Sequence, residues 1–155
     1  MELKAFEEFV YIILVNASQT ASHEEAQVTH TLLSDLNAFY KHMITDDDIV
    51  LLTEEINALR HYFGIQKIRY GKRFDIYIHD TADGEIFIER FAIINFVDNT
   101  FNSLLNRYEC FFRIDISVVI KERTILLEIT VDVKSEKEFY RKSFIKRGGR
   151  LCTSS

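Results

Sequence analysis

The sequence predicts an α+β protein whose helical first part is followed by a sheet-containing second part. Up to about Gly71, apolar residues recur every three or four positions, which is the period of an amphipathic helix. Beyond Gly71, apolar and polar residues alternate, as they do in half-buried strands. With 155 residues, of which 47% are hydrophobic, the chain can bury a core of ordinary size.

Two helices are expected first, forming an antiparallel hairpin. The first covers Glu2 to about Gln19 and is followed by a polar turn at Ser18–Ser22. The run Ser22-His23-Glu24-Glu25 has the form of a capping box, so a second helix is expected from there to about Met43. The apolar residues that would form its buried stripe are Val28, Leu32, Leu33, Leu36 and Phe39.

A third helix is expected from Leu52 to Tyr70. Leu52, Ile56, Leu59 and Phe63 fall on one stripe of this helix. Gly71 follows, and glycine readily adopts the left-handed conformation that ends many helices. The acidic run at residues 46–48 would begin this helix, where negative charge meets the positive end of the helix dipole.

The second part should contain strands around one helix. A strand starting at Phe74 would end in a turn at residues 80–84, and residues 85–89 would add a short strand. Arg90 to Asn106 has helical spacing. Residues 112–120 and 125–133 then form a predicted hairpin around residues 121–124. Ser135 would cap a last helix that reaches about Ile145, before a mobile tail from Gly148.

Charge and cysteine content restrict the classes of function. The formal net charge of −5 argues against general nucleic-acid affinity. Cys110 and Cys152 lack metal-ligand spacing and suggest a reducing compartment. No apolar run approaches the roughly 18 residues of a membrane span. We therefore expect a cytoplasmic location, either free or as the cytoplasmic part of a membrane receptor tethered outside this chain.

The C-terminal region is basic within an otherwise acidic chain. A solvated helix face with cations near its C-terminus is the favoured interpretation. Contact with nucleic acid, an anionic membrane surface or an acidic partner is the alternative. The basic residues concerned are Lys137, Arg141, Lys142, Lys146, Arg147 and Arg150.

The segment from Leu52 to Arg73 carries the most specific pattern in the chain. It fits L-x-x-E-x(6)-Y-x-x-I-Q-K-x-R-[FY]-G-x-R, with Glu55 as the acidic position and Tyr62 as the tyrosine. The remaining fixed positions are Leu52, Ile65, Gln66, Lys67, Arg69, Gly71 and Arg73. This pattern resembles the junction between the helical dimerisation region and the ATP-binding domain of LytS-type bacterial sensor histidine kinases, a family that partners LytTR-type response regulators.

The resemblance implies a domain organisation. Residues 1–71 would be a helical dimerisation and phosphoacceptor-like region, and residues 72–147 a truncated ATPase-like domain of the GHKL type, a partial α/β sandwich. Residues 148–155 would be the mobile tail. The helical hairpin would pair with a second copy into a four-helix bundle. The residues of this dimer seam would be Phe6, Phe9, Ile12, Ile13, Leu32, Leu36 and Phe39.

The phosphoacceptor position of the family is altered in this chain. Family members carry P-H-F-L-F-N on the first helix, and its histidine attacks the γ-phosphate of ATP. The aligned string is Tyr11-Ile12-Ile13-Leu14-Val15-Asn16, in which Leu14 and Asn16 match and Ile12 replaces the histidine. Isoleucine has no lone pair, so no phosphorylation is expected there. The five histidines lie elsewhere and are interpreted as surface or cap residues.

The nucleotide site that the resemblance implies is also reduced. The family's N box has a Glu-Asn pair, in which the Asn binds Mg²⁺, and Asp98 and Asn99 occupy these positions. Asp132 would replace the aspartate that accepts a hydrogen bond from adenine. The alternative is that Asp98 and Asn99 simply face solvent. Glycine-rich boxes do not follow, so Mg²⁺ and ATP would bind weakly or not at all.

Two main hypotheses follow from this pattern. The chain is either a degenerate sensor-kinase module that acts by dimerisation or by binding a partner, or a kinase fragment that keeps weak Mg²⁺–ATP binding and phosphorylates in trans. For the module, the expected partners are a second copy, a LytTR-type regulator or another sensor kinase. A third hypothesis is nucleic-acid binding through the basic tail, which the net charge disfavours.

Overall fold

The computed structural model describes residues 3–23, 26–80 and 84–148. Within these ranges it contains four α-helices, a short 3₁₀ helix and six strands in two sheets. The predicted α+β class is therefore confirmed as a mixed α/β protein, while the GHKL-like sandwich stays a prediction. The chain divides into two compact units, Met1–Asp46 with Asn57–Gly71 and Asp47–Ile56 with Lys72–Ser155. The three predicted domain ranges stay predictions.

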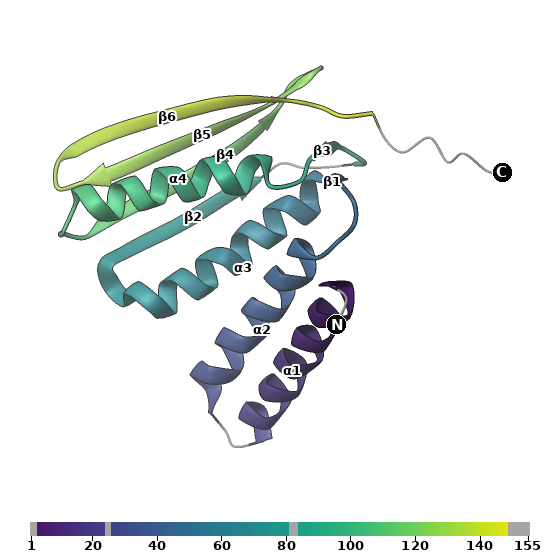
Figure 1. The fold of residues 1–155 in the computed structure, drawn as a ribbon. Coiled ribbons are helices and arrows are strands. Elements are labelled where there is room, and N and C mark those ends of the chain that lie inside the picture. Colours follow the sequence, from purple (N-terminus) through teal and green to yellow (C-terminus); the bar gives the residue numbers. More distant parts are fainter. Residues whose placement is uncertain (1–2, 24–25, 81–83, 149–155) are drawn as a thin grey trace. The chain divides into compact units, whose positions relative to one another are not determined.

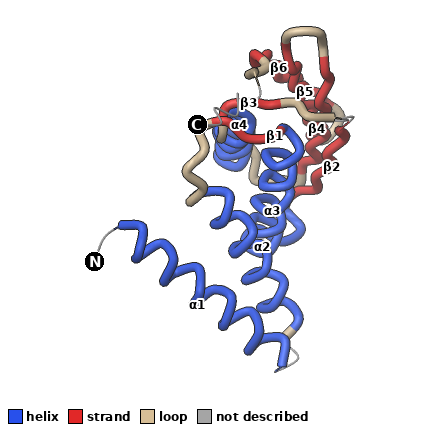
Figure 2. Tube along the Cα trace, turned by 90° about the vertical axis from the view of Figure 1, so that its right-hand side faces the viewer, coloured by secondary structure: helices blue, strands red, loops and turns tan. Residues whose placement is uncertain are grey.

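The first unit contains a helical hairpin. Helices α1 (Leu3–His23) and α2 (Gln27–Met43) run in opposite directions and contact each other, as predicted (Figure 1, Figure 2). The unit is completed by residues 57–70 of α3 (Leu52–Tyr70). Phe39 of α2 and Tyr62 of α3 contact each other, with ring centroids 5.9 Å apart. The side chains of α2 therefore meet both neighbouring helical segments of this unit.

The boundary between the first two helices is a correction to the sequence-based prediction. Ser18–Ser22 does not form a turn but continues α1, and Ser22 does not cap α2. The hydroxyl of Thr20 donates to the carbonyl of Asn16, so a polar side chain is satisfied inside the helix. Helix α2 instead follows Ala26, which makes no side-chain cap. The predicted partners Glu24 and Glu25 lie outside the described residues.

The predicted buried stripe of α2 is also wrong. None of the residues of α2 is buried, and the side chain of Val28 is 68% exposed. The other four stripe residues are half-buried: Leu32, Leu33, Leu36 and Phe39. The neighbouring helical segments of this unit cover only part of the apolar stripe.

Helix α3 matches its prediction closely. Its stripe residues are all buried, and the helix ends at Tyr70 before Gly71, whose φ is +58°. The acidic run at residues 46–48 does not begin it, because strand β1 (Ile49–Leu51) intervenes. Glu54 and Glu55 occupy its first turn instead, and Glu54 accepts a hydrogen bond from the backbone N–H of Leu51.

The second unit is built on a four-stranded sheet with the order β2-β4-β5-β6. Its strands are β2 (Phe74–Asp80), β4 (Phe112–Ile120), β5 (Thr124–Val133) and β6 (Glu136–Ile145). Only β2 and β4 are parallel within this sheet. Helix α4 (Ala92–Arg107) covers one face (Figure 1). The rings of Phe74, Phe101 and Phe112 pack there with centroids 4.8 to 6.3 Å apart.

A second, two-stranded sheet pairs β1 with β3 (Phe87–Glu89). The short strand predicted over residues 85–89 is thus confirmed. The N–H of Arg147 donates to the carbonyl of Phe87, so the segment that follows Ile145 reaches this small sheet. None of the described helices is long and apolar enough to cross a membrane.

Strand β6 corrects the predicted last helix. Val133 pairs with Glu136, so Lys134 and Ser135 form a two-residue hairpin turn and Ser135 does not cap a helix. Ion pairs with β5 hold the charged residues of β6: Lys137 with Asp132 at 3.5 Å, and Arg141 with Glu128 at 2.6 Å. These cross-strand pairs outweigh the helical propensity of Glu, Lys and Arg. The predicted tail beyond Gly148 lies outside the described residues.

Candidate functional site

Asp98 and Asn99, which the resemblance assigns to the N box, lie in the middle of α4, in the helix predicted for them. Ile94, Val97 and Phe101 of the same helix are buried against the sheet. Asn99 is exposed and Asp98 is half-buried. Both N-box side chains therefore sit away from the fully buried stripe of the helix.

Asp132 lies on the opposite side of the sheet from α4. Its neighbours Val131 and Val133 are buried, and side chains alternate between faces along a strand. The carboxylate of Asp132 instead faces Nζ of Lys137. The structure thus brings Asp98 and Asn99 together but not Asp132, and binding of Mg²⁺ or ATP by these residues stays a prediction. The described residues contain no group of three or more His, Cys, Asp or Glu side chains that could hold a metal.

The predicted phosphoacceptor position and four of the seven residues of the predicted dimer seam lie on α1. The side chains of Phe6, Phe9, Ile12 and Ile13 are outside the described ones. Leu32, Leu36 and Phe39 of α2 are half-buried. The dimer seam therefore stays a prediction.

Glu55 has a structural role at the start of α4 that the sequence pattern alone did not reveal. Its side chain is fully buried, and its carboxylate accepts hydrogen bonds of 3.1 to 3.2 Å from the backbone N–H groups of Phe91, Ile93 and Ile94. Backbone N–H groups at the start of a helix lack internal partners and carry positive partial charge. Glu55 thus caps α4 from another helix. Its place beside Ile56 on the buried side of α3 was the signal that could have revealed it.

Arg73 acts at the other end of α4. Its Nη2 donates to the carbonyls of Leu105 and Tyr108, both at 2.7 Å. These carbonyls belong to the end of the helix, where negative partial charge collects. The pattern that resembles the LytS-type junction contains both Glu55 and Arg73. In this chain those two positions hold the opposite ends of α4, the helix that carries the predicted N-box pair.

A polar contact in the first unit joins α2 to α3. Nδ1 of His61 lies 2.9 Å from Oδ1 of Asp35, and both side chains are partly exposed. A Cβ atom at Gly64 would overlap the carboxylate of Asp35. Glycine inside a helix costs about 1 kcal/mol relative to alanine. Gly64 therefore provides the space in which Asp35 reaches His61.

A second carboxylate cluster joins the end of α4 to β6. Glu138 accepts hydrogen bonds from the hydroxyls of Tyr108 and Tyr140 and from Arg107, the last at 2.9 Å. The hydrogen bonds from the two tyrosines and Arg107 lower the pKa of Glu138 below its usual value. The bond to Glu138 raises the pKa of Tyr108, and burial together with Glu138 raises the pKa of Tyr140.

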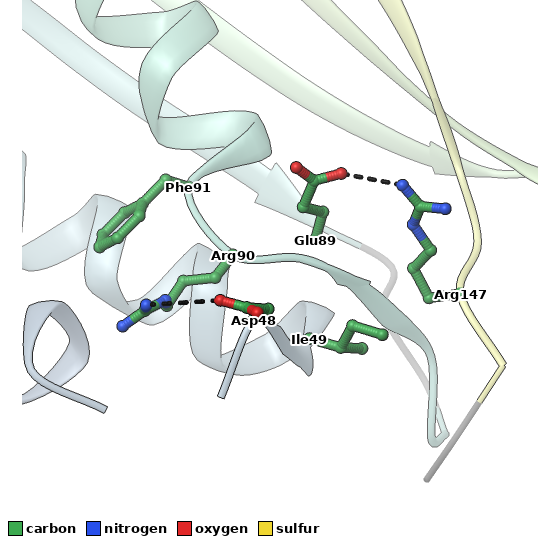
Figure 3. A pocket seen from close by; sticks show the side chains of 6 residues that line it. All are labelled: Asp48, Ile49, Glu89, Arg90, Phe91 and Arg147. Atoms are coloured by element: carbon green, nitrogen blue, oxygen red, sulfur yellow. Dashed lines mark hydrogen bonds and ion pairs between the residues drawn. The ribbon is translucent and has the colours of Figure 1, made fainter. Parts of the chain in front are cut away.

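A pocket of about 370 Å³ opens beside the start of α4 (Figure 3). Its two arginines face its two carboxylates: Arg147 lies 2.9 Å from Glu89, and Arg90 lies 4.0 Å from Asp48. Ile49 and Phe91 complete the lining, so the lining side chains have equal numbers of opposite charges. A charged ligand would have to displace an internal partner. Asp98, Asn99 and Asp132 do not line this pocket.

One family model matches the helical part of the chain and the first residue of the strand after it. Residues 6–74 match the family model of histidine kinases. The match runs from α1 to the first residue of β2. It supports a relationship of this part of the chain to the histidine kinase family. No curated protein matches the chain.

Proposed function

We propose that this chain is a degenerate sensor histidine kinase module that signals by dimerisation or partner binding and does not phosphorylate itself. The observation that carries the proposal is Ile12, which occupies the position of the phosphoacceptor histidine. An aliphatic side chain offers neither the lone pair nor the proton chemistry that attack on phosphorus requires. The histidine kinase match over residues 6–74 supports the family context.

The position of Asp132 supports the loss of nucleotide chemistry. A working site would need the N-box pair and the adenine-binding carboxylate to line one cavity. Asp132 is on the sheet face away from α4 and forms an ion pair with Lys137. Asn99 is exposed on the helix.

The incompletely buried apolar stripe of α2 supports dimerisation. None of its residues is buried, although Leu32, Leu36 and Phe39 share one face. A second helical hairpin would remove this face from water, and burial of apolar surface contributes roughly 25 cal/mol per Å². In the proposed module the second hairpin belongs to another copy of this chain or to another sensor kinase. A LytTR-type response regulator would be the downstream partner.

Incubation with labelled ATP and Mg²⁺ tests the proposal. We expect neither saturable nucleotide binding nor acid-labile phosphate on the wild-type chain. We expect the same of an Ile12→His variant, in which the nucleophile is restored but the nucleotide site is not.

Asn99→Ala provides the matched control. Saturable ATP binding by the wild type that disappears in Asn99→Ala would contradict the proposal. It would favour the alternative, a kinase fragment that holds Mg²⁺–ATP through Asp98 and Asn99 and phosphorylates a histidine on another chain.

A further inference from the structure

The chain passes between the two units at three points, after Asp46, Ile56 and Gly71. One residue close to each point contacts α4 or the residues that lead into it. These residues are Asp48, Glu55 and Arg73, all of which belong to the second unit. We call them the junction clamp.

The contacts of the junction clamp cover both ends of α4. The carbonyl of Asp48 accepts the N–H of Arg90 at 2.9 Å, just before the helix. Glu55 accepts three N–H groups at the start of the helix, and Arg73 donates to two carbonyls at its end. The helix dipole favours each contact, because negative groups lie at the start of α4 and a positive group lies at its end.

The start of α4 depends on this arrangement. Phe91, the residue before the helix, has a φ of +64°, which is unfavourable for a bulky L-residue. Its N–H is one of the three that Glu55 accepts. Backbone strain of this kind persists only where the surroundings hold it in place. A displacement of Glu55 would therefore release the first turn of α4.

We infer that the junction clamp transmits the state of the helical unit to α4, which makes α4 the element that reads out signalling by the first unit. This rests on the proposed function in which the helical unit receives a partner. Between Glu55 and Arg73 the chain is α3, unbroken to Tyr70. Glu55 lies in the first turn of α3, and Arg73 follows its last residue by three positions. Because α3 is the continuous segment that joins them, its rotation or unwinding would move Glu55 or Arg73 and so change a contact with α4.

Native-state hydrogen exchange on the full chain, without nucleotide, tests the inference. Asp35→Asn weakens the contact with His61 in the first unit and leaves the second unit's sequence unchanged. We expect it to speed exchange of the amides of Phe91, Ile93 and Ile94 by about tenfold, because weaker packing of α3 loosens Glu55. The control Lys121→Gln, in an exposed turn of the second unit, should leave these amides unchanged.

Glu55→Gln completes the test. On its own it should speed exchange of the same three amides, and in its presence Asp35→Asn should add nothing further there. If Glu55→Gln does not fold, Arg73→Gln replaces it, with exchange in the last turn of α4 as the readout. The inference is overturned if Asp35→Asn speeds exchange in α2 and α3 while α4 is unaffected, or if its effect on α4 persists in the Glu55→Gln background. Because no nucleotide is present, ATP binding would contradict the proposed function without affecting this result.

Discussion

Gly64 and Asp35 form a pair of residues whose effects on stability should depend on each other. Gly64→Ala raises helix propensity but pushes the carboxylate of Asp35 away from His61. We expect Gly64→Ala to destabilise the wild type, and to stabilise the Asp35→Ala variant by about 1 kcal/mol because the clash is then absent. Urea unfolding of the four proteins in this double-mutant cycle measures both effects. If Gly64→Ala changes the free energy of unfolding equally in the wild type and in Asp35→Ala, the absence of a side chain at Gly64 is not needed to accommodate Asp35.

Lys134 is a second residue at which the backbone conformation determines how a substitution affects stability. It has a φ of +55° in the two-residue turn between β5 and β6, while the following Ser135 does not have a positive φ. A positive φ at the first turn position alone is typical of a type II′ turn, which favours glycine there. Lys134→Gly should therefore stabilise the protein by about 1 kcal/mol.

Arg123 offers the matched control for this substitution. It lies in the other hairpin turn, between β4 and β5, and its φ is not positive. Arg123→Gly should destabilise slightly, because glycine there only adds freedom to the unfolded chain. Thermal unfolding of both variants checks the prediction, and equal shifts in Tm would contradict it.

The structural role of a residue could be predicted from the sequence where it depends only on neighbouring positions in the chain. Gly71 follows the last turn of an apolar stripe, and both the stripe and the left-handed cap are confirmed. The role of Glu55, in contrast, depends on residues that are distant in the sequence. Its three partners lie 36 to 39 residues away. A buried acid can be suspected from its position on the stripe, but its partners follow only from the tertiary fold.

At the scale of elements, the cluster around Glu138 should make the attachment of β6 to α4 depend on pH. The pKa of Glu138 is lowered in the folded protein. Its stabilising contribution is thus present above its unfolded pKa of about 4.3 and is lost as pH falls through the lower folded value. The pKa values of Tyr108 and Tyr140 are raised, so their contribution is present below about pH 10 and is lost at higher pH.

Glu138→Gln isolates the acidic half of this dependence. At pH 7 we expect it to destabilise by about 1 kcal/mol, a value reduced by solvent screening. The difference from wild type should shrink as pH falls from the unfolded pKa through the lowered folded pKa, below which Glu138 is protonated in both states. Urea unfolding between pH 3 and 7 measures it, with the exposed neighbour Glu136→Gln as control. A difference independent of pH would contradict the role of the Glu138 charge.

Helices and strands were predicted well where the apolar residues follow one clear helical or strand repeat. They were predicted poorly where a polar segment is compatible with two kinds of secondary structure. Strands β4 and β5 and helix α4 follow clear apolar patterns and are confirmed. Residues 18–22 read as a turn because they are polar, yet Thr20 satisfies its hydroxyl within α1. Residues 136–145 read as a helix because they are rich in Glu, Lys and Arg, yet they pair with β5 along their whole length.

The position of Asp132 relative to Asp98 and Asn99 could likewise be predicted only in part from the sequence. The alternation in β5 already placed Asp132 opposite to Val131 and Val133 in the sequence. What the sequence did not state is which sheet face α4 covers. Once the aromatic contacts of Phe101 place α4 over the buried residues of the sheet, Asp132 is separated from Asp98 and Asn99.

For the whole molecule, the proposed dimer can be tested at the half-buried face of α2. Leu36→Asp introduces a charge into the predicted seam, so it should convert a dimer into a monomer. Thr29→Asp, on an exposed position of the same helix, should leave the association unchanged. Sedimentation velocity at several protein concentrations measures the state of each variant. A wild type that stays monomeric at all concentrations would contradict self-association and leave a different sensor kinase as the partner.

The two units are interleaved along the chain, and this has a consequence for how the protein can be divided. A fragment that begins at Lys72 lacks β1, the strand that pairs with β3, and lacks the carboxylate that holds three amides of α4. Such a fragment should melt without cooperativity, whereas one that begins at Asp47 retains both features. Recombination with a crossover after Gly71 would therefore separate Glu55 and β1 from their partners, whereas a crossover after Asp46 would keep them together.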